Sequence, residues 1–163
     1  MKESTVADVS LNTAEHSVEP GADHTAEPRT ISIFGYELIR EILLPEILGK
    51  DTPEILYWAG KRLARKYPLA DFDEVISFFH NASWGQLEIK KESGNEMEIE
   101  LLSPLHVSRV KSKAEHYFQL EAGFLAQQME LQKEVVAEAF EHPVKKGNKV
   151  QFTVKWDNKD YIK

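Results

Sequence analysis

The sequence contains no cysteine and no long uninterrupted run of apolar residues. The absence of cysteine excludes disulfides, thiolate nucleophiles and zinc sites with cysteine ligands, and it fits a reducing compartment. The N-terminus lacks an apolar stretch of signal-peptide length. Nowhere do about 18 apolar residues occur together, as a membrane-spanning helix requires. The sequence therefore predicts a cytoplasmic protein with no membrane span.

Basic residues are few relative to acidic ones. The chain has 20 Lys and Arg against 27 Asp and Glu, which gives a net charge of −7. Nucleic-acid binding depends largely on positive charge, and we interpret the basic cluster "GKRLARKYP" as the solvated face of a helix. We therefore expect no nucleic-acid partner.

The composition changes after the first 30 residues. Residues 1–30 contain no aromatic residue, show no hydrophobic periodicity and carry a net charge of −4. Such a segment has too little apolar surface to offset the entropy lost on ordering. The rest of a chain with 42% hydrophobic residues can bury one core. We predict a disordered acidic tail over 1–30 and a single domain over 31–163.

The first part of this domain is predicted to be helical. Apolar residues at helical spacing predict three helices, which cover residues 31–49, 51–67 and 71–81. Pro45 should end or kink the first helix before a final turn that closes at Gly49. Asp51 or Thr52 should cap the second helix, and Asp71 should cap the third.

The hydrophobic period then changes from that of a helix to that of a strand. Apolar and polar residues alternate over 86–102 around a turn at Gly94, and again over 134–142 and 149–156. In the first hairpin, the alternation predicts cross-strand pairs of Leu87 with Leu101, Ile89 with Ile99, and Lys90 with Glu98. A capping box at 112–115 opens a helix that should end near Gln132. The fold class is therefore α+β: N-terminal helices, then two β-hairpins separated by a long helix, forming a four-stranded antiparallel sheet packed on helices.

The long helix carries polar residues where apolar ones are expected. On a helical wheel, Glu121 falls near the middle of the apolar arc, with Gln128 beside it. One interpretation is a buried carboxylate paired with an Arg, a Trp or Tyr donor, or backbone amides. The other is a small-molecule site in which Glu121 and Gln128 orient the ligand, while Tyr117 and Phe124 line the cavity.

Several motifs in this half of the chain resemble a known family. They are the Glu-Ala-Gly-Phe-Leu run at 121–125, a following strand with Glu138, a turn glycine at Gly147, and the alternating Val150, Phe152 and Val154. They resemble the vinyl-reductase-like small-molecule-binding domain, which shares its fold with subunits of the TRAPP vesicle-tethering complex, and the uncharacterised YslB-type proteins of Bacillus.

The resemblance implies an α+β fold, dimerisation through the first two helices, and in some relatives a pocket for an apolar or aromatic molecule or an acyl chain. Relatives that bind metal or are acylated use cysteines near the last hairpin, where this chain has Val144 and Val150. We therefore expect no metal site, no cofactor and no acylation through cysteine.

Two functions follow as competing hypotheses. The first is a non-catalytic module that holds a small apolar molecule between the Glu121 helix and the sheet. The second is a homodimeric interaction or adaptor protein without a ligand. The residues expected at its interface, on the first two helices, are Leu38, Ile42, Leu56, Ala59 and Leu63. An enzyme is a weaker third hypothesis, because the sequence names no second catalytic group beside Glu121.

Overall fold

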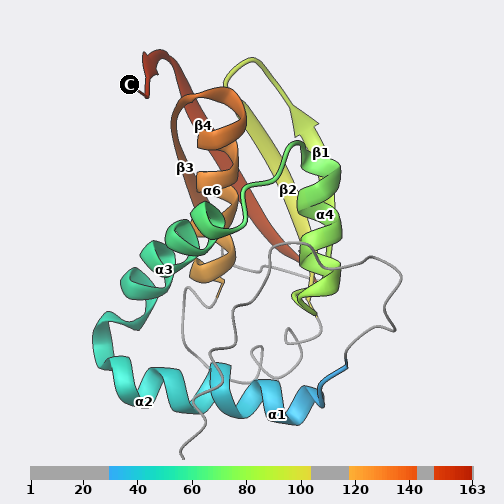
Figure 1. Cartoon of the computed structure of the whole chain (residues 1–163), viewed down its shortest axis with the longest axis vertical. Coiled ribbons are helices and arrows are strands. Elements are labelled where there is room, and N and C mark those ends of the chain that lie inside the picture. Colours follow the sequence, from blue (N-terminus) through green and yellow to red (C-terminus); the bar gives the residue numbers. More distant parts are fainter. Residues whose placement is uncertain (1–29, 104–117, 143–148, 163) are drawn as a thin grey trace, which may run out of the picture.

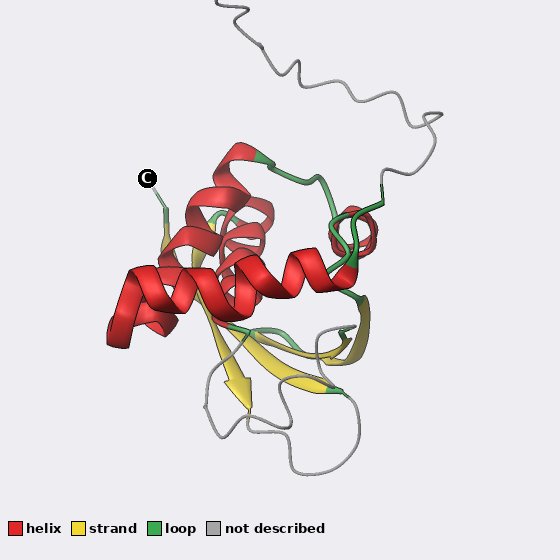
Figure 2. Ribbon diagram, turned by 90° about the horizontal axis from the view of Figure 1, so that it is seen from below, coloured by secondary structure: helices red, strands yellow, loops and turns green. Residues whose placement is uncertain are grey.

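The helices pack against one face of a four-stranded antiparallel sheet (Figures 1 and 2). The computed structural model describes residues 30–103, 118–142 and 149–162. Within these ranges, the order is three helical segments, a hairpin, a long helix and a second hairpin, which confirms the predicted α+β class. The predicted tail, the capping box at 112–115 and Tyr117 lie outside the described residues.

The first helix changes its winding along its length. It consists of α1 (Ile33–Glu37), a π-helical stretch η1 (Leu38–Leu43) and α2 (Leu44–Leu48), which together we call the arm. A π-helical turn bonds five residues back, and here the Leu44 amide donates to the Ile39 carbonyl. Pro45, which has no amide hydrogen to offer, follows this wider turn, and the helix continues past it. It closes at Gly49, where φ is 67°, as predicted.

The next two helices begin differently. A 3-10 turn, η2 (Gly49–Asp51), leads into α3 (Thr52–Lys66), where Asp51 makes no side-chain cap and the Thr52 hydroxyl donates to the Gly49 carbonyl. Of the two predicted caps, Asp51 therefore makes no capping bond, and the Thr52 hydroxyl donates a hydrogen bond instead of accepting one from a helix amide. In α4 (Phe72–Asn81), the Asp71 carboxylate accepts a hydrogen bond from the Glu74 amide at 3.0 Å, which confirms that cap.

The sheet brings the two hairpins together through their second strands. The strands are β1 (Gln86–Glu92), β2 (Glu96–Leu102), β3 (Val135–His142) and β4 (Val150–Tyr161). Their order across the sheet is β1-β2-β4-β3. The inward side chains of β4, Val150, Phe152, Val154 and Trp156, are all buried, as the alternation predicts.

The register of the first hairpin agrees with the prediction only near its open end. Leu87 lies opposite Leu101, and Ile89 lies opposite Ile99. A β-bulge between Ile89 and Lys91 then inserts one extra residue, so Glu98 faces Lys91 and the predicted Lys90–Glu98 pair is wrong.

The long helix α6 (Gln119–Lys133) is covered on all sides over the ten residues 121–130. It packs between the sheet and α3, and two glycines set the distance to α3. A Cβ atom on Gly123 would lie 1.9 Å from the Tyr57 carbonyl oxygen, and one on Gly60 would lie 2.1 Å from the Leu120 carbonyl oxygen. The two backbones are therefore in contact, and no larger residue fits at either glycine without movement.

Candidate functional site

Glu121, the carboxylate singled out by the sequence, forms a buried ion pair with Arg40 of the arm. Nη2 of Arg40 lies 2.9 Å from Oε1 and 2.7 Å from Oε2 of Glu121, and the two side chains are 3% and 1% exposed. Nη1 of Arg40 also donates to the Tyr36 hydroxyl at 3.1 Å. Burial alone would lower the pKa of Arg40, but the nearby charge of Glu121 raises it above its ordinary value.

This ion pair joins two segments that are far apart in the sequence. The arm crosses the molecule at one end, while α6 runs through its centre (Figures 1 and 2). Arg40 comes from the π-helical stretch, and it shares an inward row at four-residue spacing with Tyr36, Leu44 and Leu48. The pair therefore fixes the arm against the core, which is the first of the two interpretations of Glu121.

The other polar side chains of α6 also have protein partners. Gln128 accepts from the Leu69 amide at 3.1 Å and donates to the Tyr67 carbonyl at 2.7 Å, so it holds the connection between α3 and α4. Glu130 accepts from Nζ of Lys61 at 2.8 Å and from the Ala137 amide at 3.3 Å. In the described part of the chain, no buried side-chain nitrogen or oxygen lacks a hydrogen-bond partner.

Phe124 is the centre of an aromatic cluster. Its ring stacks on Phe78 with centroids 4.6 Å apart, and it meets Phe79 and Trp84 edge-to-face at 5.9 Å and 5.4 Å. Such contacts stabilise a core beyond the area they bury. Phe124, Glu121 and Gln128 thus lie on one helix with all of their groups in contact with protein, whereas Tyr117 is outside the described residues.

The arm exposes an apolar face on its outer side. Six large apolar side chains are between 41% and 67% exposed there: Phe34, Leu38, Ile39, Ile42, Leu43 and Ile47. In a straight α-helix these positions would spread over about 220°, somewhat more than half of the circumference, because each residue turns by about 100°. The wider π-helical turns of η1 reduce this spread, so that the apolar row and the inward row of Arg40 keep to opposite sides.

The structure separates the residues predicted for a dimer interface. Leu38 and Ile42 belong to the exposed face of the arm, while Leu56 is buried in the core at 8% exposure. Ala59 and Leu63 are half-buried on α3. Phe34 and Ile47 were not among the predicted residues, although they continue the same apolar spacing and lie on the exposed face.

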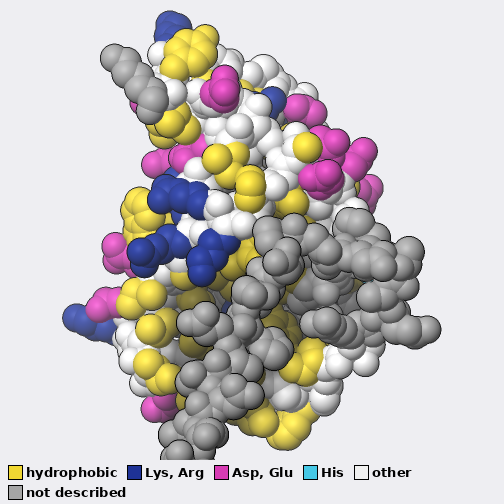
Figure 3. Space-filling model, in the orientation of Figure 1, with side chains coloured by type: hydrophobic (Ala, Val, Ile, Leu, Met, Phe, Trp, Pro, Cys, Tyr) yellow, Lys and Arg dark blue, Asp and Glu magenta, His cyan; other side chains and the backbone are white. Residues whose placement is uncertain are grey.

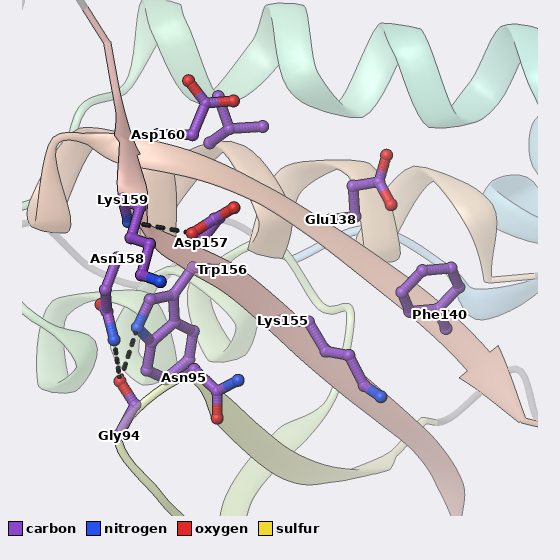
Figure 4. Close-up of a pocket in the computed structure, with 11 residues that line it drawn as sticks. Gly94, Asn95, Glu138, Phe140, Lys155, Trp156, Asp157, Asn158, Lys159 and Asp160 are labelled. Carbon is purple, nitrogen blue, oxygen red and sulfur yellow. Dashed lines mark hydrogen bonds between the residues drawn. The ribbon is translucent and has the colours of Figure 1, made fainter.

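An open cleft lies at the end of the sheet where β3 and β4 meet the turn of the first hairpin (Figure 4). It has a volume of about 770 Å³, and its lining contains none of Glu121, Phe124 or Gln128. The indole Nε1 of Trp156 and the side-chain amide of Asn158 both donate to the Gly94 carbonyl, at 3.0 Å and 2.8 Å. These polar groups hold the end of β4 to the hairpin turn.

Within the residues that the structure describes, no group of three or more His, Cys, Asp or Glu side chains is arranged to hold a metal ion. None of the helices in these ranges has both the length and the apolar character needed to cross a membrane.

Comparison with known proteins places the chain in a family. It is 47% identical over 132 residues to the uncharacterised protein YslB of Bacillus subtilis, a match covering 81% of this chain and 89% of that protein. A vinyl-4-reductase family protein from Methanocaldococcus jannaschii has a similar structure, with a TM-score of 0.61 and 22% identity over 80% of this chain and 85% of that one.

A subunit 3 of the trafficking protein particle complex from Naegleria fowleri, covalently bound to palmitic acid, gives a TM-score of 0.49. It is 14% identical over 80% of this chain and 91% of that chain. The resemblance inferred from the sequence is therefore confirmed at the level of family and fold. The family model for a protein of unknown function, DUF2507, matches residues 33–155, and the chain belongs to this family.

Proposed function

We propose that this protein is a non-catalytic binding module that works as a homodimer, and that its interaction surface is the outer face of the arm. The observation that carries the proposal is the row of six exposed apolar side chains from Phe34 to Ile47. Half-exposed Leu, Ile and Phe residues present on the order of 100 Å² each. Together they expose roughly 600 Å², whereas the largest apolar patch on a typical monomeric protein measures about 300–600 Å².

The inner contacts of the arm support the same proposal. A helix that carried this much apolar surface on a loose segment would collapse onto the core. Here the Arg40–Glu121 ion pair holds the opposite side of the helix inward, so the apolar side faces out. A preformed surface loses little conformational entropy on binding.

A second copy of the chain is the partner we favour. A stable interface buries about 800 Å² per partner, and the arm with adjoining residues approaches that area. The family resemblance inferred from the sequence implies dimerisation through the first two helices, which agrees with the position of the exposed face. In a two-fold symmetric dimer, each residue of the arm contributes twice.

The alternative hypothesis of a small-molecule pocket beside Glu121 has less support. The polar groups on which it depends, Glu121 and Gln128, are hydrogen-bonded to Arg40, Leu69 and Tyr67. A ligand could use them only by displacing these contacts. We therefore assign the binding function to the arm.

The test is the oligomeric state of three proteins by sedimentation equilibrium. We expect the wild type to be a dimer. Ile42→Glu should weaken the dimer on the order of 100-fold or more, because burying unpaired charge costs at least about 3 kcal/mol. Lys91→Glu, a charge reversal on an exposed residue of β1, is the matched control and should leave the dimer unchanged. A monomeric wild type, or a dimer that tolerates Ile42→Glu, would refute the proposal.

A further inference from the structure

The C-terminal half of α3 presents a basic face that forms no ion pair with the residues that the structure describes. Arg62, Arg65 and Lys66 are all exposed, and Trp58 lies on the same side of the helix one turn before Arg62. Figure 3 shows basic side chains gathered over α3. We call these four residues the basic face.

The three cations of the basic face differ from most others in the described ranges. Arg40, Lys61, Lys90, Lys133, Lys149 and Lys155 each form an ion pair with a carboxylate. Arg62, Arg65 and Lys66 form none with any carboxylate that the structure describes, although Nε of Arg65 donates to the amide oxygen of Gln127 at 3.1 Å. Among the described residues of a protein with an excess of acidic side chains, these three neighbouring cations therefore have no carboxylate partner.

A solvated helix end explains only part of this arrangement. Cations in a last turn interact favourably with the helix dipole, which accounts for Arg65 and Lys66. The helix dipole does not account for Trp58, which is 55% exposed and meets the ring of Tyr57 edge-on with ring centroids 6.2 Å apart. Exposed Trp together with Arg is the composition typical of binding hot spots. The basic face thus has the chemistry of a site for an acidic segment.

We propose that the basic face of α3 is the docking site for the chain's own N-terminal segment, residues 1–28. This segment contains six acidic residues and one basic residue. Fully extended, it reaches about 95 Å, whereas α3 with its 15 residues is about 22 Å long, so the segment can reach α3 from the start of the arm. Attachment to the same chain raises its effective concentration to the order of 1 mM, so even a contact with a dissociation constant of about 1 mM is half occupied.

This inference is independent of the proposed dimer. The basic face belongs to α3, and none of its residues is part of the exposed apolar row of the arm. Docking of the segment would shield Trp58 and the three cations from other acidic molecules, which gives the segment a competitive role at this surface.

The experiment uses the absence of cysteine. Ser17→Cys creates a single attachment point for a nitroxide spin label in the full chain, and the label broadens NMR signals of nuclei close to it. The three tryptophan indoles are separate reporters: Trp58 is in the basic face, while Trp84 and Trp156 are buried. At about 10 mM salt, where the Debye length is about 30 Å, we expect at least a twofold loss of the Trp58 signal relative to the other two. At about 1 M salt, where the Debye length is about 3 Å, the signal should recover.

Substitutions identify the site. Arg62→Gln, Arg65→Gln and Lys66→Gln combined should abolish the broadening at low salt. Replacing Lys91 and Lys159, two exposed cations elsewhere, by Gln should not affect it. The salt series uses unaltered residues on α3 and so gives an answer even if the triple variant is unstable.

Three results would overturn the proposal. They are an absence of broadening at Trp58, broadening that survives both high salt and the triple substitution, and broadening that occurs only between a labelled and an unlabelled copy mixed together. The last result would assign the contact to a neighbouring molecule. The spin-label experiment tests the docking of the N-terminal segment, and sedimentation of Ile42→Glu tests the dimer, so one proposal can be refuted while the other stands.

Discussion

Replacing Arg40 by methionine keeps much of the side-chain length but removes the positive charge beside Glu121. In the native protein, Nη2 of Arg40 contacts both carboxylate oxygens within 3 Å, and both side chains are almost completely shielded from water. After the substitution, solvent cannot replace the guanidinium unless the arm moves away. The carboxylate is then left buried without its counter-charge.

The structure sets the expected size of the loss. Breaking a buried ion pair by removing one partner costs about 3–5 kcal/mol, and the low exposure of both groups places Arg40→Met within that range. Replacing both partners by apolar residues is often close to neutral. We therefore expect Arg40→Met with Glu121→Met to lie within about 2 kcal/mol of the wild type. Because each single substitution removes one partner and should cost about 3 kcal/mol or more, the two substitutions should be coupled by at least about 4 kcal/mol.

Urea unfolding measures these differences. All proteins should carry Ile42→Glu, because dissociation of a dimer would otherwise contribute to the apparent stability. Hydrogen exchange supplies the local test. Relative to the wild type, Arg40→Met should speed the exchange of the arm amides more than that of the α6 amides. A loss of less than about 1 kcal/mol for Arg40→Met, or a double variant as unstable as the sum of the two single variants, would refute the role of the pair.

Two further predictions concern the contact of α3 with α6 and with the edge of the sheet. Gly123→Ala should lower the free energy of unfolding in urea by about 1–3 kcal/mol, because its Cβ would meet the Tyr57 carbonyl. Gly35→Ala is the control and should be neutral or stabilising, since its Cβ would have one neighbour at 3.9 Å. Equal effects of the two substitutions would contradict the close contact. Burial raises the pKa of Tyr57, whose hydroxyl accepts a hydrogen bond from the Ala139 amide. Because the unfolded tyrosine ionises first, its contribution to stability is present below pH of about 10 and is lost above it. Between about pH 8 and 11, the urea midpoint of Tyr57→Phe should therefore fall less than that of the wild type; an equal fall would contradict this assignment.

The periodicity of the sequence was sufficient to predict the elements and the fold class. Alternation over 86–102 and 149–156 located the strands, and the helical spacing located the three helical segments. The alternation pattern did not predict the strand register beyond a β-bulge, nor the full length of the last strand. The bulge after Ile89 shifted the register by one residue, and β4 continues to Tyr161, beyond the end of the alternating pattern.

The site was harder to predict because it depends on contacts between distant residues. The helical wheel placed Glu121 correctly among buried residues, but Arg40 lies 81 positions away and gave no local signal of pairing. The arm presented a different difficulty. It is apolar on two faces, and periodicity does not tell which face is buried. The inward row contains Tyr36 and Arg40, while the more apolar row around Ile42 faces out.

Native mass spectrometry of the purified wild type, combined with solvent extraction, tests the central claim most directly. The claim is that the outer face of the arm joins two copies of a module that needs no ligand. It predicts a species of twice the 18.7 kDa chain mass, from which no small molecule is extracted, and a single-chain mass for Ile42→Glu. A wild type at the mass of one chain, or one that carries an extractable apolar molecule, would contradict it.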